Sequence, residues 1–296
     1  MLSVTQHKIS IIIASVDRDE YLQRCLACIE KAYDYAKGIN LEVLVIFQDK
    51  KEKSSIRTVN SELFSFYYLE KRGLSSARNF GIKKSAGEYL VFLDDDTVIR
   101  EDFLSVLLKN ILNNEGSAYC CRDTDPEKRK LYSGRFSGEK SKFLNYCEYI
   151  YFLGYAHIIK RSSIKNLGLY DERFGLGAKY PAAEESDIFF RLKQRGEKVI
   201  YLPKLVVYHP VGNETSELKC FNYAYAISAM LVKQMCLDYI YAVLYLFIIT
   251  KIILKSFFRT LQILFFPKNI EGKNKIYQYK SVLIGSLKGA RDYICV

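Results

Sequence analysis

Residues 72–96 read RGLSSARNFGIKKSAGEYLVFLDDD, and this stretch decides the fold. The part Leu74–Lys84 has the pattern of a helix. Tyr89–Leu93 is a compact apolar run, typical of a buried strand, and it continues directly into three aspartates at 94–96. The stretch therefore predicts a helix, a buried strand and a polar loop at the carboxyl end of that strand.

The same alternation continues on both sides of this stretch. Lys8–Ala14 (KISIIIA) and Leu41–Phe47 (LEVLVIF) are short β-branched runs that predict strands. Residues 22–36 repeat apolar side chains at helical spacing, and Phe103–Leu112 predicts a further helix. Strands that alternate with helices indicate an α/β fold with a mostly parallel sheet and helices on both faces.

The second half of the chain is less regular. Gly154–Lys160, Lys198–Leu202 and Leu205–Tyr208 predict three strands, and Glu184–Arg195 predicts a helix. Gly168–Pro181 is rich in glycine and predicts a loop.

Polar residues follow three of the predicted strands, at 15–18, 48–49 and 94–96. Ligands of such sheets bind beyond the carboxyl ends of the strands, so we expect these segments to form one site. In extended geometry Asp94 and Asp96 point to one side and Asp95 to the other. Paired carboxylates suit a hard cation such as Mg²⁺ or Mn²⁺, which could stabilise a leaving diphosphate.

The same residues allow a second interpretation. The sequence DDDTV at 94–98 also fits the nucleophile motif of haloacid-dehalogenase-type phosphatases, in which the first aspartate attacks phosphorus. That motif is usually on the first strand. Here it follows about the fourth predicted strand, because Ser65–Leu69 predicts a strand between Leu41–Phe47 and Tyr89–Leu93. The later acidic cluster also opens a helix instead of following a strand.

Four blocks together resemble the family 2 glycosyltransferases, which have the GT-A, Rossmann-like fold. They are IIIASVDR (11–18), the stretch 72–96, LGLYDERFGLGAKYPAAEESDIFFRLKQRGEKVIYLP (167–203) and VVYHP (206–210). The resemblance covers roughly residues 8–215. It implies transfer of a sugar from a nucleotide-sugar donor with a divalent metal, Mn²⁺ or Mg²⁺.

The resemblance also implies roles for single residues. Asp94 and Asp95 would hold the ribose and nucleotide, Arg78 would face the donor diphosphate, and Asp96 would bind the metal with His209 as a further ligand. The implied donor-binding residues are Ala14, Ser15, Asp17, Arg18, Gln48, Gly73, Arg78, Asp94 and Asp95. Many relatives carry an aspartate-rich segment near Gln48 that contacts uracil. The Gln48 amide can hydrogen-bond a base edge, and we expect a UDP-sugar.

A general base is implied at Glu184–Glu185, where the family carries a Gly-Glu-Asp-x-Asp signature opening a helix. Inverting transfer needs a carboxylate that accepts the proton of the attacking acceptor hydroxyl. The usual aspartate is replaced here by Glu185, which is longer by one methylene. Both glutamates therefore remain candidates, and Glu185 is favoured.

The end of the chain is both apolar and basic. The formal net charge is +11, and +7 of it lies in residues 231–296. No nucleic-acid motif accompanies this charge, which favours an anionic lipid surface as the partner. Tyr239–Thr250 is uncharged but short of the about 20 residues of a membrane span. Lys251, Lys255 and Arg259 recur every four residues and predict a helix lying in the headgroup layer. The alternatives are a buried helical appendage, a dimer contact and a spanning helix with snorkelling lysines.

The compartment follows from the cysteines and the start of the chain. Eight cysteines occur, and Ile9–Ala14 is too short for the core of a secretory signal. We expect reduced thiols and a position at the cytoplasmic face of the cell membrane, peripheral or monotopic. Cys25 and Cys28 form a CxxC with no second pair nearby, which does not predict a zinc site.

The sequence therefore predicts two domains. Residues 1–218 would form the GT-A domain, with a nucleotide half at about 1–120 and an acceptor half at about 121–218. Residues 219–296 would form a helical, membrane-associated tail. The predicted function is inverting sugar transfer to a saccharide acceptor, lipid-linked, in bacterial surface polysaccharide synthesis. A non-catalytic, membrane-bound GT-A scaffold is the other alternative to the phosphatase.

Overall fold

The computed structural model describes residues 8–48, 62–113, 116–124, 140–210, 216–237, 242–265 and 270–294. The described residues form two compact units. One unit contains those of 1–170 and 188–211, and the other contains those of 171–187 and 212–296.

The first unit is built on a nine-stranded sheet within the described residues. Its elements in chain order are β1 (Ile9–Ser15), α1 (Asp19–Ala36), β2 (Leu41–Gln48), β3 (Phe64–Leu69), α2 (Leu74–Lys84), β4 (Tyr89–Asp94), β5 (Val98–Ile99), α3 (Phe103–Asn113), β6 (Ala118–Thr124), β7 (Lys142–Phe143), the 3-10 helix η1 (Tyr146–Tyr151), β8 (Ala156–Lys160), α4 (Arg161–Leu167) and β9 (Val199–Tyr208). Helix α5 (Glu184–Gln194) begins in the second unit and ends in the first.

The first four strands form the parallel part of the sheet, in the order β3-β2-β1-β4. Ile11 of β1 pairs with Val43 of β2 on one side and with Val91 of β4 on the other. Parallel strands place their carboxyl ends at one edge, so the ends of β1, β2 and β4 lie side by side there. The predicted α/β fold is confirmed.

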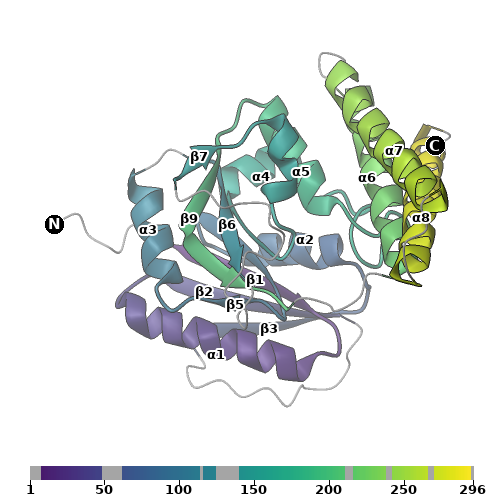
Figure 1. The fold of residues 1–296 in the computed structure, drawn as a ribbon. Coiled ribbons are helices and arrows are strands. Elements are labelled where there is room, and N and C mark those ends of the chain that lie inside the picture. Colours follow the sequence, from purple (N-terminus) through teal and green to yellow (C-terminus); the bar gives the residue numbers. More distant parts are fainter. Residues whose placement is uncertain are drawn as a thin grey trace. The chain divides into compact units, whose positions relative to one another are not determined.

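Helices cover both faces of this parallel part (Figure 1). Alternate residues of a strand point to opposite faces. Val43 and Val45 of β2 belong to the core that includes the apolar side of α1, whereas Leu44 and Ile46 pack with Ala77 of α2. These interleaved contacts fix the register of β2, because a slip by one residue would exchange the two faces.

The rest of the sheet is mixed. Strand β8 lies antiparallel between β4 and β6, and β9 is parallel to β6. The prediction of two short strands at 198–202 and 205–208 was wrong, because β9 continues through Pro203. The ladder with β6 shifts register there: Cys121 pairs with Leu202, and Arg122 pairs with Val206. Proline has no N–H to donate to a ladder and is tolerated at such an irregularity.

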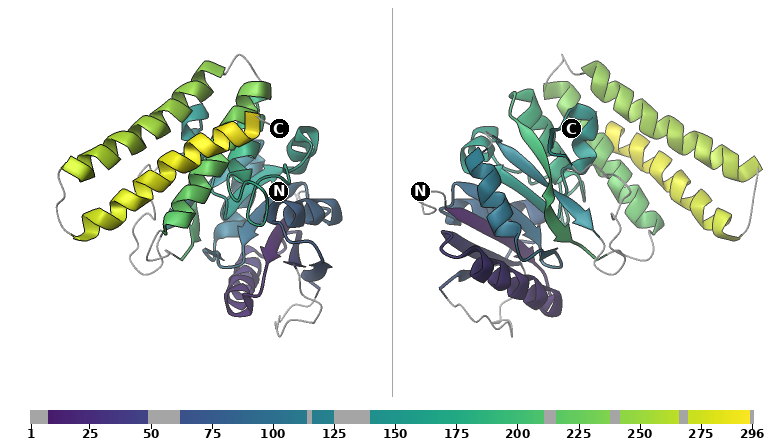
Figure 2. Two further views of the ribbon diagram at one scale, coloured as in Figure 1. Left: turned by 90° about the vertical axis from the view of Figure 1, so that its right-hand side faces the viewer. Right: turned by 60° about the vertical axis from the view of Figure 1, so that its left-hand side comes forward.

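The second unit contains α6 (Glu217–Leu237), α7 (Ala242–Phe265) and α8 (Ile270–Ile294), which confirms the predicted helical tail. Figure 2 shows α7 and α8 side by side, and they are in contact. Helix α8 approaches α6 closely at two glycines. A Cβ at Gly285 would lie 2.6 Å from the carbonyl oxygen of Phe221, and one at Gly289 would lie 2.0 Å from that of Tyr225. None of the described helices has the length and apolar character needed to cross a bilayer.

Candidate active site

The three aspartates follow β4 at the edge where β1 also ends. Asp94 is the last residue of β4 and pairs with Ala14 of β1. The N–H of Thr97 donates to the Asp94 carbonyl oxygen at 3.1 Å, which closes a tight turn. The Thr97 hydroxyl donates to the Tyr155 carbonyl oxygen at 3.1 Å and fastens the turn to the sheet. The turn therefore holds the carboxylates in fixed directions.

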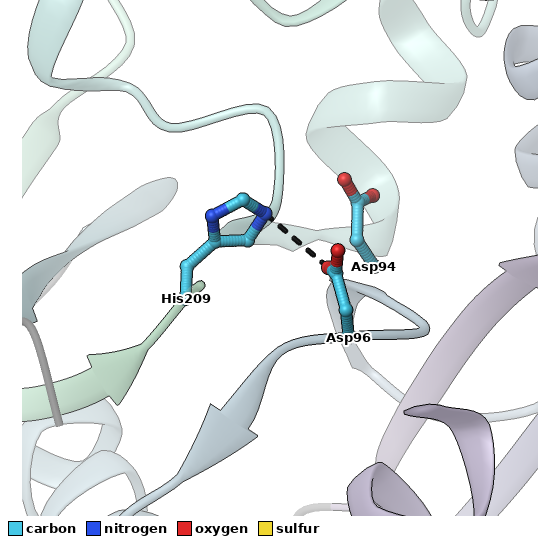
Figure 3. Close-up of side chains that lie close together, drawn as sticks. All are labelled: Asp94, Asp96 and His209. Carbon is cyan, nitrogen blue, oxygen red and sulfur yellow. Dashed lines mark ion pairs between the residues drawn. The ribbon is translucent and has the colours of Figure 1, made fainter. Parts of the chain in front are cut away.

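Asp94, Asp96 and His209 form one cluster, and each offers a ligand atom within 4.8 Å of the others. Figure 3 shows the three side chains converging, with His209 Nε2 3.2 Å from Asp96 Oδ1. His209 follows directly after β9, and Tyr208 of β9 pairs with Val98, two residues after Asp96. This antiparallel pairing explains how residues more than a hundred positions apart meet.

The cluster is electrostatically coupled. Burial disfavours charge on Asp96, but the nearby His209 imidazole and Arg18 guanidinium lower the pKa of Asp96 to about 2. Burial opposes the charged form of His209 as well, yet its contact with Asp96 raises the pKa of the imidazole. The Asp96 carboxylate is therefore ionised at neutral pH and attracts positive charge.

These side chains fit a divalent cation. Within the described part of the chain, Asp96 Oδ1 is buried and makes no hydrogen bond, with His209 Nε2 near it at 3.2 Å. Two carboxylates and one imidazole form a donor set that suits Mn²⁺. The carboxylate oxygens of this set also suit Mg²⁺. Asp94 enters this donor set by geometry, as the pairing of Asp94 with Asp96 suggested, although the family resemblance assigned it to the ribose and nucleotide.

Asp95 does not belong to this cluster and has partners of its own in the turn that follows β4. It accepts a hydrogen bond from the Ser15 hydroxyl at 2.7 Å and pairs with Arg18 at 2.9 Å. Burial is the main cause that raises the pKa of Asp95. Arg18 also contacts Asp96, so one guanidinium bridges two of the three aspartates.

Two other predicted donor residues meet at the end of β2. The N–H of Gly73 donates to Gln48 Oε1 at 2.7 Å, which ties β2 to the start of α2. Gly73 has φ +149, a conformation that side chains other than glycine rarely adopt. Asp17 is exposed, has φ +49 and lies 3.9 Å from Arg72. Their contacts with a nucleotide stay predictions.

Arg78 is almost completely buried. Its guanidinium donates to Asp94 Oδ1 at 3.0 Å and to the Gly154 carbonyl oxygen at 2.6 Å. A buried guanidinium needs such partners, and the pair fixes the direction of the Asp94 carboxylate. The predicted contact of Arg78 with a diphosphate stays a prediction.

Tyr155 was not singled out from the sequence. Its ring stacks on the His209 imidazole with centroids 4.1 Å apart, and its hydroxyl donates to Asp123 Oδ2 at 2.7 Å. Tyr155 therefore supports the imidazole from one side. Only the pairing of β8 with β4 and β6 brings it there, so no local signal marks it.

The two candidate bases belong to the second unit, whereas the three aspartates belong to the first. Both lie in the first turn of α5, directly after Ala183, whose φ is +69. Glu184 is buried, whereas Glu185 is half-buried and accepts a hydrogen bond from the Ser186 hydroxyl at 3.0 Å. Glu185 is thus the more accessible of the two carboxylates.

The family-level comparison agrees with the fold. The model of the glycosyl transferase family 2 matches residues 10–168, which is more than half of the chain. The chain belongs to this family, and the resemblance drawn from the sequence is confirmed.

Similar proteins include other glycosyltransferases. An uncharacterised glycosyltransferase of Haemophilus influenzae is 28% identical over 172 residues, which are 54% of this chain and 64% of that protein. The GalNAc(5)-diNAcBac-PP-undecaprenol beta-1,3-glucosyltransferase of Campylobacter jejuni is 26% identical over 180 residues, 57% of this chain and 56% of that protein. The match thus spans less than two thirds of either relative.

Solved structures share the fold at low sequence identity. Staphylococcus aureus TarS 1-349 in complex with UDP-GlcNAc gives a TM-score of 0.59 at 13% identity, covering 97% of this chain and 92% of that chain. The mannosyltransferase PcManGT from Pyrobaculum calidifontis, in complex with GDP-Man and Mn²⁺, gives a TM-score of 0.55 at 15% identity, covering 96% and 73%. These similarities establish the fold of the chain.

Proposed function

We propose that this family 2 glycosyltransferase transfers a sugar from a UDP-sugar, with inversion and with a divalent metal, to a lipid-linked saccharide at a membrane surface. The synthesis of a bacterial surface polysaccharide is the process that such an acceptor suits. The observation that carries the proposal is the cluster of Asp94, Asp96 and His209 at the carboxyl edge of the sheet.

The donor is proposed from the site and from two similar structures. TarS has been solved with UDP and with UDP-GlcNAc, and PcManGT with GDP-Man and Mn²⁺. Held by Asp94, Asp96 and His209, a cation would neutralise the charge that develops on the leaving diphosphate. Asp95 and Ser15 would contact the nucleoside, and Gln48 would hydrogen-bond the base.

Glu185 is the proposed general base. Its carboxylate would accept the proton of the acceptor hydroxyl while the hydroxyl oxygen attacks the anomeric carbon. The bond to the diphosphate breaks as the new glycosidic bond forms on the opposite face, which inverts the configuration. The half-buried position of Glu185 favours it over the buried Glu184.

The acceptor is proposed to be lipid-linked. The Campylobacter jejuni relative is named for an acceptor, GalNAc(5)-diNAcBac-PP-undecaprenol, that is linked to a lipid. Helix α7 presents large exposed apolar side chains, among them Val243, Phe247 and Phe258. Lys251 and Lys255 are exposed on the same helix and would face anionic headgroups at the cytoplasmic side. The side chain of Arg259, third in the predicted basic stripe, lies outside the described side chains.

Nucleotide binding tests the donor assignment. We expect UDP with Mn²⁺ to raise the thermal stability of the protein, because a ligand that binds only the folded state adds about 2.7 kcal/mol at a hundredfold excess over its Kd. The measurement is thermal unfolding with UDP, GDP, ADP and CDP, each with and without Mn²⁺. UDP-sugars are then ranked in the same way. A stabilisation by GDP alone would reassign the base, and none by any nucleotide would remove the donor site.

Membrane association is tested separately by flotation with lipid vesicles. We expect binding to phosphatidylcholine vesicles only when anionic phosphatidylglycerol is included. The double variant Phe247→Glu and Phe258→Glu is expected to lower the partition at least about tenfold, because a buried phenylalanine contributes roughly 1.5–3 kcal/mol. Phe143→Glu, which changes an exposed phenylalanine of β7, is the matched control. Doubling of the molecular mass in solution without vesicle binding would identify the surface as a dimer contact.

The family match favours the transferase over the two alternatives. The phosphatase interpretation needs Asp94 as a free nucleophile, yet Asp94 is paired with Arg78 and lies in the cluster with Asp96 and His209. A non-catalytic scaffold would bind UDP without turning over any UDP-sugar. Release of UDP from a UDP-sugar distinguishes the scaffold from the enzyme.

A further inference from the structure

The second unit contains a buried polar cluster that the proposed chemistry does not use directly. Lys233 of α6 places its Nζ 2.8 Å from Asp171 Oδ2 and 2.6 Å from Asp187 Oδ1. The neighbouring Gln234 donates from Nε2 to Asp187 Oδ1 at 2.7 Å. All of these contacts lie within one unit.

The cluster is deeply buried. Asp187 and Gln234 are 0% exposed and Lys233 is 6% exposed. Burial disfavours charge on Asp171, but Arg173 and Lys233 lower the pKa of this carboxyl well below its usual range. A buried ion pair seldom adds net stability over an apolar core, whereas loss of one partner is costly. What such a cluster provides is one fixed geometry.

The positions of Asp171 and Asp187 in the chain show which part of the structure the cluster holds in place. Asp171 and Asp187 are the two ends of the segment 171–187, so a single ammonium group of α6 ties both ends of this loop together. Asp187 lies two residues after Glu185, in the first turn of α5. Immediately before this turn, Ala183 has φ +69, a conformation that is costly for alanine and needs support from its surroundings.

Residues inside the segment 171–187 contact both α6 and the end of α8. The Tyr180 ring lies 5.4 Å from that of Tyr225 on α6, and its hydroxyl donates to the Asp292 carbonyl oxygen at 3.3 Å. Arg173 donates to the Tyr293 hydroxyl at 3.0 Å. Helices α6 and α8 thus contact the segment 171–187 at both ends and in its interior.

We propose that Lys233, assisted by Gln234, is a positioning residue that holds the first turn of α5 and so directs the Glu185 carboxylate. The tail then positions a residue of the reaction, in addition to any contact with lipid. This inference rests on the proposed role of Glu185 as the base. It assigns to α6 a residue that acts through Asp187 and does not itself touch the substrate.

The test uses the full-length protein and water as the acceptor. The rate is the release of UDP from the UDP-sugar that stabilises the wild type most. We expect Lys233→Met to lower kcat about 10- to 100-fold, because a small misplacement of a catalytic group has an effect of this size. The KM for the donor and the affinity for UDP with Mn²⁺ are expected to stay within about twofold. Lys233→Arg should recover part of kcat, and Lys280→Met, an exposed lysine of α8, should behave as wild type.

A second readout separates positioning from general stability. Loss of the ammonium group removes the positive charge that Lys233 places on Asp187 in the first turn of α5, so the acid limb of the kcat profile should move to higher pH in Lys233→Met. Should Lys233→Met fail to fold, Gln234→Leu keeps the lysine and the side-chain volume and is expected to lower kcat by a smaller factor. A parallel loss of kcat and UDP affinity, or an unchanged kcat in the folded variant, overturns the inference.

Glu185→Gln in the same assay separates the two proposals. If Glu185→Gln is inactive while Lys233→Met keeps the wild-type kcat and pH profile, the positioning role alone is wrong. If Glu185→Gln keeps the wild-type kcat, the base assignment is wrong, and the positioning role is overturned with it.

Discussion

Replacing Asp96 with asparagine is expected to abolish the Mn²⁺-dependent stabilisation by UDP and to lower the rate of UDP release about 10²-fold or more. The pKa of Asp96 is held at about 2 by the neighbouring His209 and Arg18. Asp96 therefore offers a fully ionised oxygen beside His209 and Asp94 at neutral pH. A cation that stabilises a leaving diphosphate is worth several kcal/mol, and each 1.36 kcal/mol is a factor of ten in rate. The measurement is thermal unfolding with UDP, with and without Mn²⁺, followed by the rate.

The matched control for this variant is Asp34→Asn, which changes an exposed aspartate of α1 in the same unit. The ligand-induced shift is compared within each variant, because loss of Asp96 also removes the charged partner of the half-buried His209. The asparagine side chain in Asp96→Asn keeps the shape of the aspartate but not its charge, so folding should survive. An Mn²⁺-dependent shift of wild-type size in this variant would remove the Asp96 carboxylate from the metal site.

Much of the first unit was accessible from the sequence because its signals are local. The run Tyr89–Leu93 and the aspartates after it are adjacent in the chain, and the parallel order of strands follows from the alternation with helices. Asp94 and Asp96 share the cluster with His209, as expected, but a turn at 95–96 brings them together and not the extended geometry on which the prediction was based.

What the sequence did not supply depends on contacts between distant residues. The resemblance implied that Arg78 faces the donor diphosphate, but no local pattern indicated that it is buried and donates to the Gly154 carbonyl just before β8. Tyr155 gains its place under His209 through the pairing of β8 with β4 and β6. Strand β9 continues through Pro203 because its ladder with β6 shifts register there, from Leu202 to Val206, and that pairing cannot be deduced from the sequence of β9 alone.

The tail illustrates why one segment can carry two proposals that need different tests. Its exposed apolar side chains motivate contact with lipid, whereas Lys233 and Gln234 are buried and clasp the segment 171–187. Deletion of the tail would remove both features together and could not separate them. Point variants on α7 and on α6 can, because the first set should change vesicle binding and the second the turnover with water.

Replacing Glu185 with glutamine is expected to lower kcat about 10²- to 10⁴-fold, the range that a general base contributes. Glutamine keeps the size of the side chain and can still accept the hydrogen bond of the Ser186 hydroxyl, but it cannot take up a proton. The stabilisation by UDP with Mn²⁺ should remain, since the proposed donor residues belong to the first unit. The measurement is kcat and KM for UDP release, alongside nucleotide binding.

Glu184→Gln is the matched control, because it changes the adjacent carboxylate in the same turn of α5. Glu184 is buried, whereas Glu185 is half-buried and so better placed to meet an acceptor hydroxyl. We therefore expect Glu184→Gln to lower kcat far less than Glu185→Gln does. The opposite order would assign the base to Glu184, and the Glu185 carboxylate, which is longer by one methylene than the aspartate of the family signature, would then serve another purpose. Equal and small effects in both variants would mean that neither glutamate takes the proton.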